Sequence, residues 1–348
     1  MNVLHVVFNL SNYSGAAFQA STLISEINSD VFNNKILSIE SAKNYESCNN
    51  SISVYKRDYF ELIFILIKSV IHSDIVHIHG FSVFSLFITW ILRKKVILKT
   101  TLNGSDDLFS IANSRFGLFK IYLASKVARN VVLSNNEFLI NEKFIPNARI
   151  IKIPNSVIIP VLDGISKEPL TFCSVGIMSE RKGFLDAITY FIDNYSCFSD
   201  SKLYIVGPLP NIEEESEDCS YAYYQKCLEK SRGYNIIFTG KLNKSELNEI
   251  YKKSISFLFF SKREGMPNVL LEAMSFNCVP ITGEIGGVAR EVIDNRCSGF
   301  IIEPSDKISL DEIYDLSQSF AAKIKVQNNN DIKVIASRYR DIYESILI

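Results

Sequence analysis

Residues 261–287 read SKREGMPNVLLEAMSFNCVPITGEIGG, and this stretch decides the fold class. The apolar run ISFLFF (255–260) before it is typical of a strand buried on both faces of a sheet. Pro267 suits the first position of a helix, because its missing N–H would be unpaired there. VLLEAM continues with strong helix formers, and VPITGE (279–284) again has strand length. The order strand, loop, helix, strand predicts part of a parallel sheet, with the loop 261–266 at the carboxyl end of its strand.

The same alternation of short apolar runs and helical patterns extends over most of the chain. It predicts an α/β fold of two Rossmann-like, doubly wound parallel-sheet domains facing across a cleft. The Pro- and Gly-containing segment 153–170 is the best linker, which places the domains at 1–162 and 170–328. The predicted strands are 3–10, 35–39, 74–80, 95–102, 130–134 and 150–154 in the first half, and 170–176, 202–207, 235–240, 255–260 and 279–284 in the second.

Composition narrows the class of protein. The net charge of −1 over 348 residues gives no indication of nucleic-acid binding, although the first 165 residues carry more basic than acidic side chains. Seven cysteines without a CxxC pair indicate reduced thiols in a cytoplasmic protein, and no signal peptide opens the chain. The apolar stretches 60–71 and 81–92 are shorter than the roughly 20 residues that span a bilayer. They fit either core helices or peripheral docking on a membrane.

The two glutamates of the deciding stretch suggest how a ligand is held. Glu264 precedes the predicted helix, whereas Glu272 lies more than one turn inside it, so the two do not form a close acid–base pair. Between them, the first amides of the helix can receive a phosphate. We therefore expect two carboxylates that hold the ends of one extended ligand by its hydroxyl groups. The competing interpretation is two solvated glutamates near a helix start.

The segment EGMPNVLLEAM, with seven residues between its glutamates, resembles the E-x7-E motif of the glycogen-synthase-like retaining glycosyltransferases of family 4, which have the GT-B fold. The resemblance implies that Glu264 binds hydroxyls of the donor sugar and that Glu272 binds the ribose diol. It also implies a final helix, 329–348, that crosses back to the first domain. Further donor-binding residues implied by it are Gly265, Met266, Pro267, Asn268, Val269 and Leu270, with Lys241 beside the base.

A second segment, SVGIMSERKGFLDAI (174–188), resembles the family's G-R-L-x-x-x-K-G signature. Lys182 matches the lysine that would neutralise the diphosphate. Ile177 stands where the family has arginine, so Arg181 is the candidate for the missing charge. The alternative is that Arg181 and Lys182 are solvated residues at a helix entry.

In the first domain, the resemblance places the Gly15 turn toward the diphosphate. It implies that His79 lies near the cleft on the acceptor side while His77 is packed inside, although the H-x-H spacing also suits a metal pair. Asn103 occupies the position of the family's histidine beside the donor sugar. Asp106 and Asp107 would hold acceptor hydroxyls or cap the following helix.

Together these features predict a cytoplasmic enzyme that needs neither cofactor nor metal. It would transfer a hexose-type sugar, with retention, from a UDP- or GDP-sugar to a hydroxyl of an oligosaccharide, with Glu264, Lys182, Arg181 and Asn103 as its catalytic set. The basic first half favours a lipid-linked acceptor of surface polysaccharide assembly, with peripheral contact at the inner membrane face. Two alternatives remain, a sugar-nucleotide 2-epimerase and a non-catalytic nucleotide-sugar binding protein.

Overall fold

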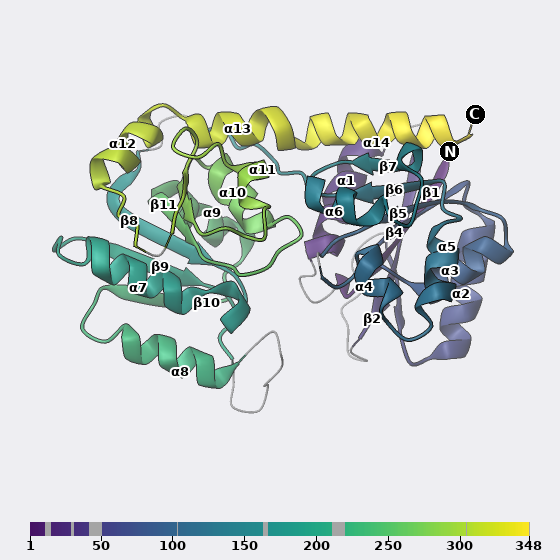
Figure 1. The fold of residues 1–348 in the computed structure, drawn as a ribbon, viewed down its shortest axis with the longest axis horizontal. Helices are drawn as coiled ribbons and strands as arrows, with labels where there is room; N and C mark the ends of the chain where they lie inside the picture. Colours follow the sequence, from purple (N-terminus) through teal and green to yellow (C-terminus); the bar gives the residue numbers. More distant parts are fainter. Residues whose placement is uncertain are drawn as a thin grey trace. The chain divides into compact units, whose positions relative to one another are not determined.

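The chain folds into two compact units, each built around its own parallel sheet (Figure 1). The computed structural model describes residues 1–10, 15–28, 31–41, 51–102, 104–162, 166–210, 220–303 and 305–347. Unit 1 comprises Met1–Ser156 together with Ile332–Ile348, and unit 2 comprises Val157–Asp331. The first unit is therefore completed by the last helix of the sequence.

Unit 1 contains a seven-stranded sheet in the order β3-β2-β1-β4-β5-β6-β7, and every printed pairing is parallel. Its central strands are near-continuous apolar runs, as expected for strands covered on both faces. The strands are β1 (Asn2–Phe8), β2 (Asn33–Glu40), β3 (Ser51–Tyr55), β4 (Ile75–His79), β5 (Lys95–Lys99), β6 (Arg129–Val132) and β7 (Ile150–Lys152).

Alternate residues of these strands point to opposite faces, and different helices cover the two faces. Leu4, Val76 and Leu98 pack with α2 (Tyr59–Ile71), α3 (Val83–Ile91) and α5 (Gly117–Ala124) on one face. On the other face, Val3, Ile75 and Ile97 pack with α1 (Gly15–Ile27) and α14 (Ile332–Leu347). Tyr339 and Tyr343 of α14 are buried there, so this helix is part of the core of unit 1.

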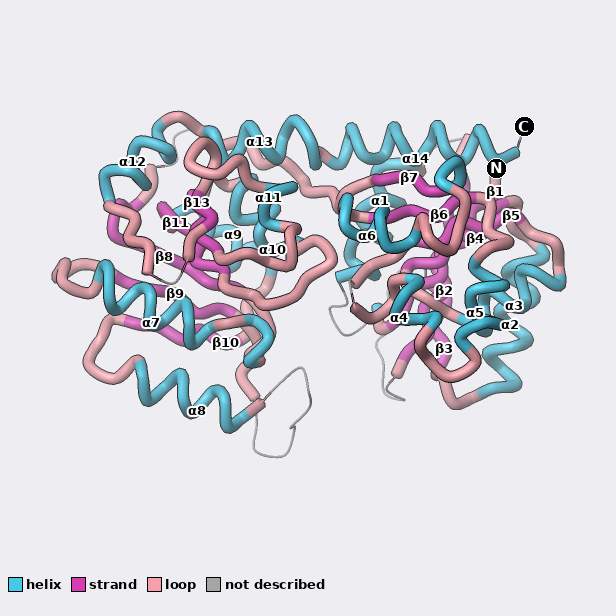
Figure 2. The backbone as a smooth tube through the Cα atoms, in the orientation of Figure 1, coloured by secondary structure: helices cyan, strands magenta, loops and turns pink. Residues whose placement is uncertain are grey.

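Unit 2 contains a six-stranded sheet in the order β10-β9-β8-β11-β12-β13. Its core joins apolar strand residues to α7, α8 and α12, and Figure 2 shows helices flanking the strands. The strands are β8 (Glu168–Val175), β9 (Lys202–Val206), β10 (Ile236–Gly240), β11 (Ser254–Phe259), β12 (Val279–Thr282) and β13 (Phe300–Ile301).

The remaining helices are distributed over both units. Those of unit 1 are α4 (Leu108–Ala112), α6 (Asn135–Asn141) and the 3-10 turn Asn147–Arg149. Those of unit 2 are the 3-10 turn Glu180–Lys182, α7 (Phe184–Tyr195), α8 (Tyr221–Lys230), α9 (Lys244–Lys253), α10 (Asn268–Ser275), α11 (Ala289–Val292), α12 (Leu310–Gln318) and α13 (Ala321–Asn330). Among the described residues, none of the helices combines the length and the apolarity needed to cross a bilayer.

The expected alternation of strand and helix is present in both units. Two observed strands, β3 and the two-residue β13, are not among the apolar runs above; the family resemblance implies β13 as the closing strand in SGFII (298–302). β3 was missed because SISVY is a short edge strand whose side chains are mostly half-exposed, so its run is not continuously apolar. The polar segment NIEEESEDCS (211–220), whose charges predict a solvated insertion, lies outside the described residues except for Ser220.

A glycine allows two loops of unit 2 to approach closely. Gly183 ends the 3-10 turn with φ +67°, and a Cβ atom there would lie 2.0 Å from the carbonyl oxygen of Phe260. Only glycine fits this position, because it has no Cβ and tolerates positive φ. The turn after β8 can therefore rest on the backbone at the end of β11.

We predict that Gly183→Ala lowers the free energy of unfolding of the full chain by about 3 kcal/mol, since both the left-handed backbone and the steric conflict oppose a side chain. Gly233→Ala is the control. Gly233 also has positive φ, +83°, but nothing lies within 4 Å of its Cβ position, so a cost of only about 1 kcal/mol is expected. Urea unfolding measures both, and equal costs would contradict the close approach at Gly183.

Candidate functional site

The order of strands in unit 2 reverses between β8 and β11, and this reversal positions the candidate site. Chain segments that leave two neighbouring strands at such a point run apart, so ligands of open α/β sheets bind outside the carboxyl ends there. The segment after β8 contains Arg181 and Lys182, and the segment after β11 contains Ser261 to Pro267. A hydrogen bond of 2.8 Å from the Lys262 amide to the Arg181 carbonyl joins the two segments.

Glu264 is the centre of this site. One oxygen, Oε1, lies 2.6 Å from Lys182 Nζ, accepts a hydrogen bond of 2.6 Å from Ser261 Oγ, and lies 3.6 Å from Arg181 Nη1. The Glu264 side chain is only 10% exposed. The three predicted catalytic side chains that the structure describes are therefore brought together, across 82 residues of sequence.

The Arg181 side chain contacts the loop that contains Glu264. Its Nη1 donates a hydrogen bond of 3.1 Å to the carbonyl oxygen of Arg263. This contact and the approach to Glu264 place the guanidinium at the site, although the side chain keeps 26% of its surface exposed. Ile177, which stands where the resemblance expects an arginine, is 37% exposed.

The helix after Glu264 begins one residue later than predicted. Pro267 has ψ 107° and precedes the helix, whose first residue is Asn268. The Pro267 carbonyl accepts hydrogen bonds from the amides of Leu270 and Leu271, at 3.2 and 3.3 Å. Pro267 is thus the N-cap rather than the first helical residue. The first turn, Asn268 to Leu270, keeps the orientation that can receive an anion.

Glu272 is held by a different cation. It lies in the second turn of α10, and its Oε1 is 2.8 Å from Nζ of Lys244, the first residue of α9. The Glu272 side chain is 14% exposed and that of Lys244 52%. The two glutamates therefore have separate cationic partners.

Other residues that the sequence predicts to bind the donor lie around this edge of the sheet. Gly265 and Met266 are buried in the loop before α10, and Met266 Sδ is 4.0 Å from Asn330 Nδ2. Val269 is half-buried in the first turn of α10. Lys241 directly follows β10, whose last residue, Gly240, accepts a hydrogen bond of 3.1 Å from the Gly207 amide.

In unit 1, two aspartates hold the loop after β5. Asp106 accepts hydrogen bonds from the Thr101 amide and hydroxyl and from the Leu102 amide. Burial raises its pKa, although these hydrogen bonds act in the opposite direction. Asp107 is the N-cap of α4, where it accepts a hydrogen bond of 2.9 Å from the Ser110 amide. Asp107 therefore has the capping role, and Asp106 organises the loop backbone. Asn103 lies outside the described residues.

Gly15 is the first residue of α1, so the helix begins at the predicted turn after β1. His79, by contrast, does not have the predicted position near an open end. It is 1% exposed and as buried as His77, which is 0% exposed. His77 is packed inside as predicted, but His79 is packed inside as well, because its ring stacks on those of His5 and His77. Because its ring is buried, His79 in this arrangement does not present a ring nitrogen to a sugar acceptor.

Three histidines gather on that covered face. His5 of β1 is in register with His77 of β4, and His79 is in register with Lys99 of β5. His5 Nδ1 lies 3.0 Å from His79 Nε2, and His77 Nδ1 lies 2.9 Å from the hydroxyl of Tyr343. The rings of His77 and His79 stack with centroids 4.0 Å apart.

Burial keeps these rings neutral. It lowers the pKa of His5 to about 4 and the pKa values of His77 and His79 well below the usual range, and the Lys99 ammonium lowers all three further. Their ring nitrogens lie within 4.8 Å of one another, a group that could hold a metal ion. Neutral imidazole is the metal-binding form, but the adjacent Lys99 ammonium opposes a second cation.

Sequence reasoning missed Ser261, Lys244, His5 and Lys99. Ser261 opens the deciding stretch but lies outside its E-x7-E segment, and Lys244 begins a helix with no motif around it. Both are identified only by their contacts with the two glutamates. His5 could have been found from its strand, because alternate residues of β1 and β4 share one face once the strands are paired.

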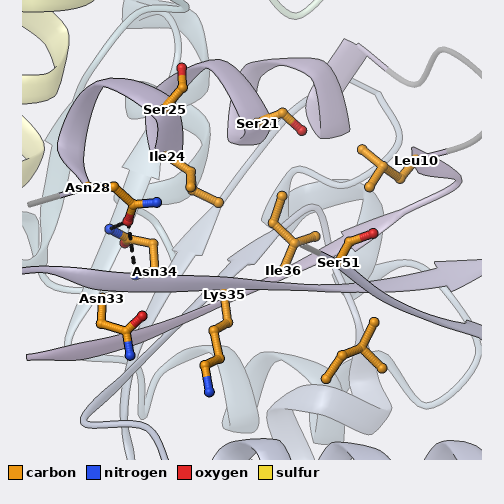
Figure 3. A pocket seen from close by; sticks show the side chains of 11 residues that line it. Leu10, Ser21, Ile24, Ser25, Asn28, Asn33, Asn34, Lys35, Ile36 and Ser51 are labelled. Carbon is orange, nitrogen blue, oxygen red and sulfur yellow. Dashed lines mark hydrogen bonds between the residues drawn. The ribbon is translucent and has the colours of Figure 1, made fainter. Parts of the chain in front are cut away.

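A separate hollow of about 760 Å³ lies in unit 1 between α1 and the strands β2 and β3 (Figure 3). Most of its lining comes from the last turns of α1 and from the first residues of β2 and β3, and Asn28 Oδ1 accepts hydrogen bonds from the Asn34 amide and side chain. These residues lie at the amino ends of the strands, whereas ligands of open α/β sheets bind at the carboxyl ends. The hollow is therefore not the candidate site.

Comparison with known proteins agrees with this geometry. Residues 162–316 match the model of the family described as glycosyl transferases group 1. Over 256 residues the chain is 26% identical to the UDP-Gal:alpha-D-GlcNAc-diphosphoundecaprenol alpha-1,3-galactosyltransferase of Escherichia coli. The match covers 66% of this chain and 63% of that relative, which is less than two thirds of the relative's length.

Two solved structures show the same fold over the whole chain. Anabaena Alr3699/HepE, in complex with UDP and glucose, has a TM-score of 0.72 at 13% identity and covers 99% of this chain and 100% of its own. The sucrose-phosphate synthase of Thermosynechococcus elongatus has a TM-score of 0.72 at 14% identity, with 99% of both chains covered. The predicted GT-B fold and the resemblance to GT-B glycosyltransferases are confirmed.

We predict that the histidine cluster makes stability depend on pH. The pKa of His5 is about 4 in the folded chain and 6.5 in the unfolded chain. Its contribution to the free energy of unfolding is therefore complete above about pH 6.5 and is lost as the pH falls toward 4. At pH 5 the loss from His5 alone is about 2 kcal/mol. Urea unfolding at pH 7 and pH 5 measures it, and His5→Gln should lose less stability than the wild type over this interval.

Burial also raises the pKa of Glu137 to about 8, so protonation of this carboxyl increases the free energy of unfolding as the pH falls. This effect opposes that of His5, and the variants are therefore compared with one another. The control is His72→Gln, because His72 is exposed at the end of α2. It should follow the wild type. Equal losses in all three proteins would show that protonation of His5 is not linked to unfolding.

Proposed function

We propose that this chain, whose residues 162–316 match the model of the glycosyl transferases group 1 family, is a glycosyltransferase that transfers a hexose-type sugar with retention from a UDP- or GDP-sugar to a lipid-linked acceptor in surface polysaccharide biosynthesis. The single observation that carries the proposal is the cluster of Lys182, Arg181 and Ser261 around Glu264 at the switch point of the second sheet. It combines a hydroxyl-binding carboxylate with cations for a diphosphate.

The proposed roles combine the roles that the family resemblance implies with the contacts described above. A carboxylate accepts hydrogen bonds from sugar hydroxyls, so Glu264 would hold the donor sugar. Lys182 and Arg181, within 2.6 and 3.6 Å of that carboxylate, would then lie beside the diphosphate next to the sugar. Glu272, held by Lys244, would bind the ribose diol of the nucleotide. The first turn of α10 adds oriented amides between the two glutamates.

In the proposed reaction the bond between sugar C1 and the diphosphate oxygen breaks, and the acceptor hydroxyl oxygen bonds to C1 on the same face. The acceptor proton passes to the departing diphosphate oxygen. Negative charge grows on the diphosphate as the bond breaks, so cations already placed there lower the barrier. Because Lys182 and Arg181 supply this charge, the reaction would need no metal ion.

The names of the comparison proteins suggest the first substrates to test. The Escherichia coli relative uses UDP-galactose and a diphosphoundecaprenol-linked GlcNAc acceptor. The similar Anabaena structures contain UDP, glucose or UDP-glucose. We therefore propose a UDP-hexose, with UDP-galactose first, and an acceptor whose sugar is carried on a lipid diphosphate.

The test is to incubate the full chain with UDP-galactose, UDP-glucose or GDP-mannose and a GlcNAc-diphosphate lipid. We expect UDP release that depends on the acceptor, a product with the anomeric configuration of the donor by NMR, and an unchanged rate in EDTA. An epimerised nucleotide sugar would identify a 2-epimerase instead. Donor binding without turnover on any acceptor would identify a binding protein, and inversion would exclude the retaining mechanism.

We predict that Lys182→Met lowers kcat/KM by about 100-fold or more, because one preorganised charge at the leaving group is lost. The control is Lys262→Met. Lys262 lies in the same pair of loops, but its side chain is 58% exposed and pairs loosely with Glu180 at 3.6 Å. It should change kcat/KM less than twofold.

Thermal unfolding of both variants shows whether each remains folded. A folded Lys182→Met protein with normal kcat/KM would exclude Lys182 from the reaction. A similar fall in the control would mean that general positive charge, rather than the lysine on Glu264, is required.

A further inference from the structure

The outer surface of α2, α3 and α5 in unit 1 carries apolar side chains where a solvated helix would carry polar ones. These helices cover one face of the sheet, and α3 packs against both α2 and α5, so their outer sides form one surface (Figure 1). Nearly half of the large hydrophobic side chains that the described residues expose lie between residues 59 and 122. We call this surface the α2–α3–α5 face.

The most exposed of these side chains are large. Phe60 and Phe64 of α2 are 93% and 67% exposed, and Leu118 of α5 is 90% exposed. Phe87 and Trp90 of α3 contact each other and reach Phe119 and Tyr122 of α5, with ring centroids 6.0 to 6.1 Å apart. The exposed residues are thus a connected aromatic surface rather than scattered single side chains, which would need no explanation.

The same face is positively charged. Residues 81–105 and 108–136 contain no aspartate or glutamate. Their exposed basic residues are Arg93, Lys95, Arg115 and Lys126, and none of these takes part in an ion pair among the described residues. α2 adds one charge of each sign, Glu61 and Lys68.

Aromatic and basic groups meet in a hollow of about 630 Å³ between the end of α3 and the end of α5. Its lining includes Trp90, Arg93, Lys95 and Lys126, and Lys126 Nζ lies 4.8 Å from the centre of the Tyr122 ring. Lys94 also lines the hollow, but its ammonium donates hydrogen bonds to the carbonyl oxygens of Ile71 and Ser73. The hollow therefore presents cations beside an apolar wall.

We propose that the α2–α3–α5 face docks on an anionic lipid bilayer. Aromatic rings with a polar edge are favoured at the boundary between water and lipid, and apolar helix faces enter it when basic residues flank them. The positive charge favours an anionic bilayer over a protein partner. Protein–protein interfaces are poor in lysine, whereas each basic residue near an anionic bilayer strengthens attachment. Exposed Phe60, Phe64 and Leu118 enter the headgroup region, and Arg93, Lys95 and Lys126 contact lipid phosphates.

This inference deepens the proposed function, since a lipid-linked acceptor lies in such a bilayer. Docking is measured without donor or acceptor, so its failure and the failure of sugar transfer are distinguishable. A protein that transfers sugar but ignores vesicles would refute only the docking face. A protein that binds vesicles but transfers nothing would refute only the proposed function.

The experiment is cosedimentation of the full chain with vesicles of phosphatidylcholine alone or mixed with phosphatidylglycerol. We expect binding to the anionic vesicles, weakened by salt, and at least tenfold weaker binding to phosphatidylcholine. Lys95→Glu/Lys126→Glu should reduce anionic binding by about 20-fold or more, at about fivefold for each basic charge lost. Phe60→Ser/Phe64→Ser should reduce binding to both kinds of vesicle by at least tenfold.

Matched controls come from unit 2. Lys226→Glu/Arg232→Glu changes two exposed cations, and Phe198→Ser/Tyr234→Ser changes two side chains that are 42% and 44% exposed. Both should bind like the wild type. Thermal unfolding, which needs neither donor nor acceptor, shows whether the face variants remain folded.

Three results would overturn the proposal. The first is a wild type that does not sediment with anionic vesicles. The second is an equal effect of the control and face variants. The third is a wild-type dimer, seen by light scattering and lost in Phe60→Ser/Phe64→Ser, together with no vesicle binding, which would mean that a second copy of the chain covers the face.

Discussion

The ion pair between Lys182 Nζ and Glu264 Oε1, which lie 2.6 Å apart, depends on the strand order and on the loops of the second unit. It requires that the chain leave β8 and β11 side by side, which the parallel strand order provides. It requires also that the two loops pass close to each other, which Gly183 allows under the backbone of Phe260. A buried carboxylate is tolerable only with such partners, because an unpaired charge is costly to remove from water.

In this site each carboxylate is paired with at least one cation close to it. Glu264 is matched by Lys182 and Arg181 on one loop, and Glu272 is matched by Lys244 at the start of α9. Each carboxylate therefore has a position set by a cation from another part of the unit. This arrangement holds the side chains in place before any ligand arrives, which is the usual requirement for selective binding of a polar molecule.

The sequence predicted the architecture well, because apolar runs of strand length are a local property. It also located Glu264 and Lys182, since both stand in recognisable segments at the carboxyl ends of strands. It did not indicate β3, whose half-exposed side chains lack an apolar pattern, nor the pairing of Lys244 with Glu272, which depends on how α9 lies beside α10. The burial of His79 was mispredicted because it depends on the pairing of β1 with β4, which places the rings of His5 and His77 against His79. Long-range packing of this kind leaves no signal in a local pattern.

The last helix gives unit 1 an unusual dependence on the order of synthesis. The strands that carry His5, His77 and Lys99 are made early, yet the face they form is closed by Tyr339 and Tyr343 of α14. Unit 2 ends at Asp331, before that helix. Domains fold as units while the chain emerges from the ribosome, so the unit encoded second can complete its core first. Until α14 arrives, the earlier unit keeps a sheet face with three imidazoles and a lysine open to water.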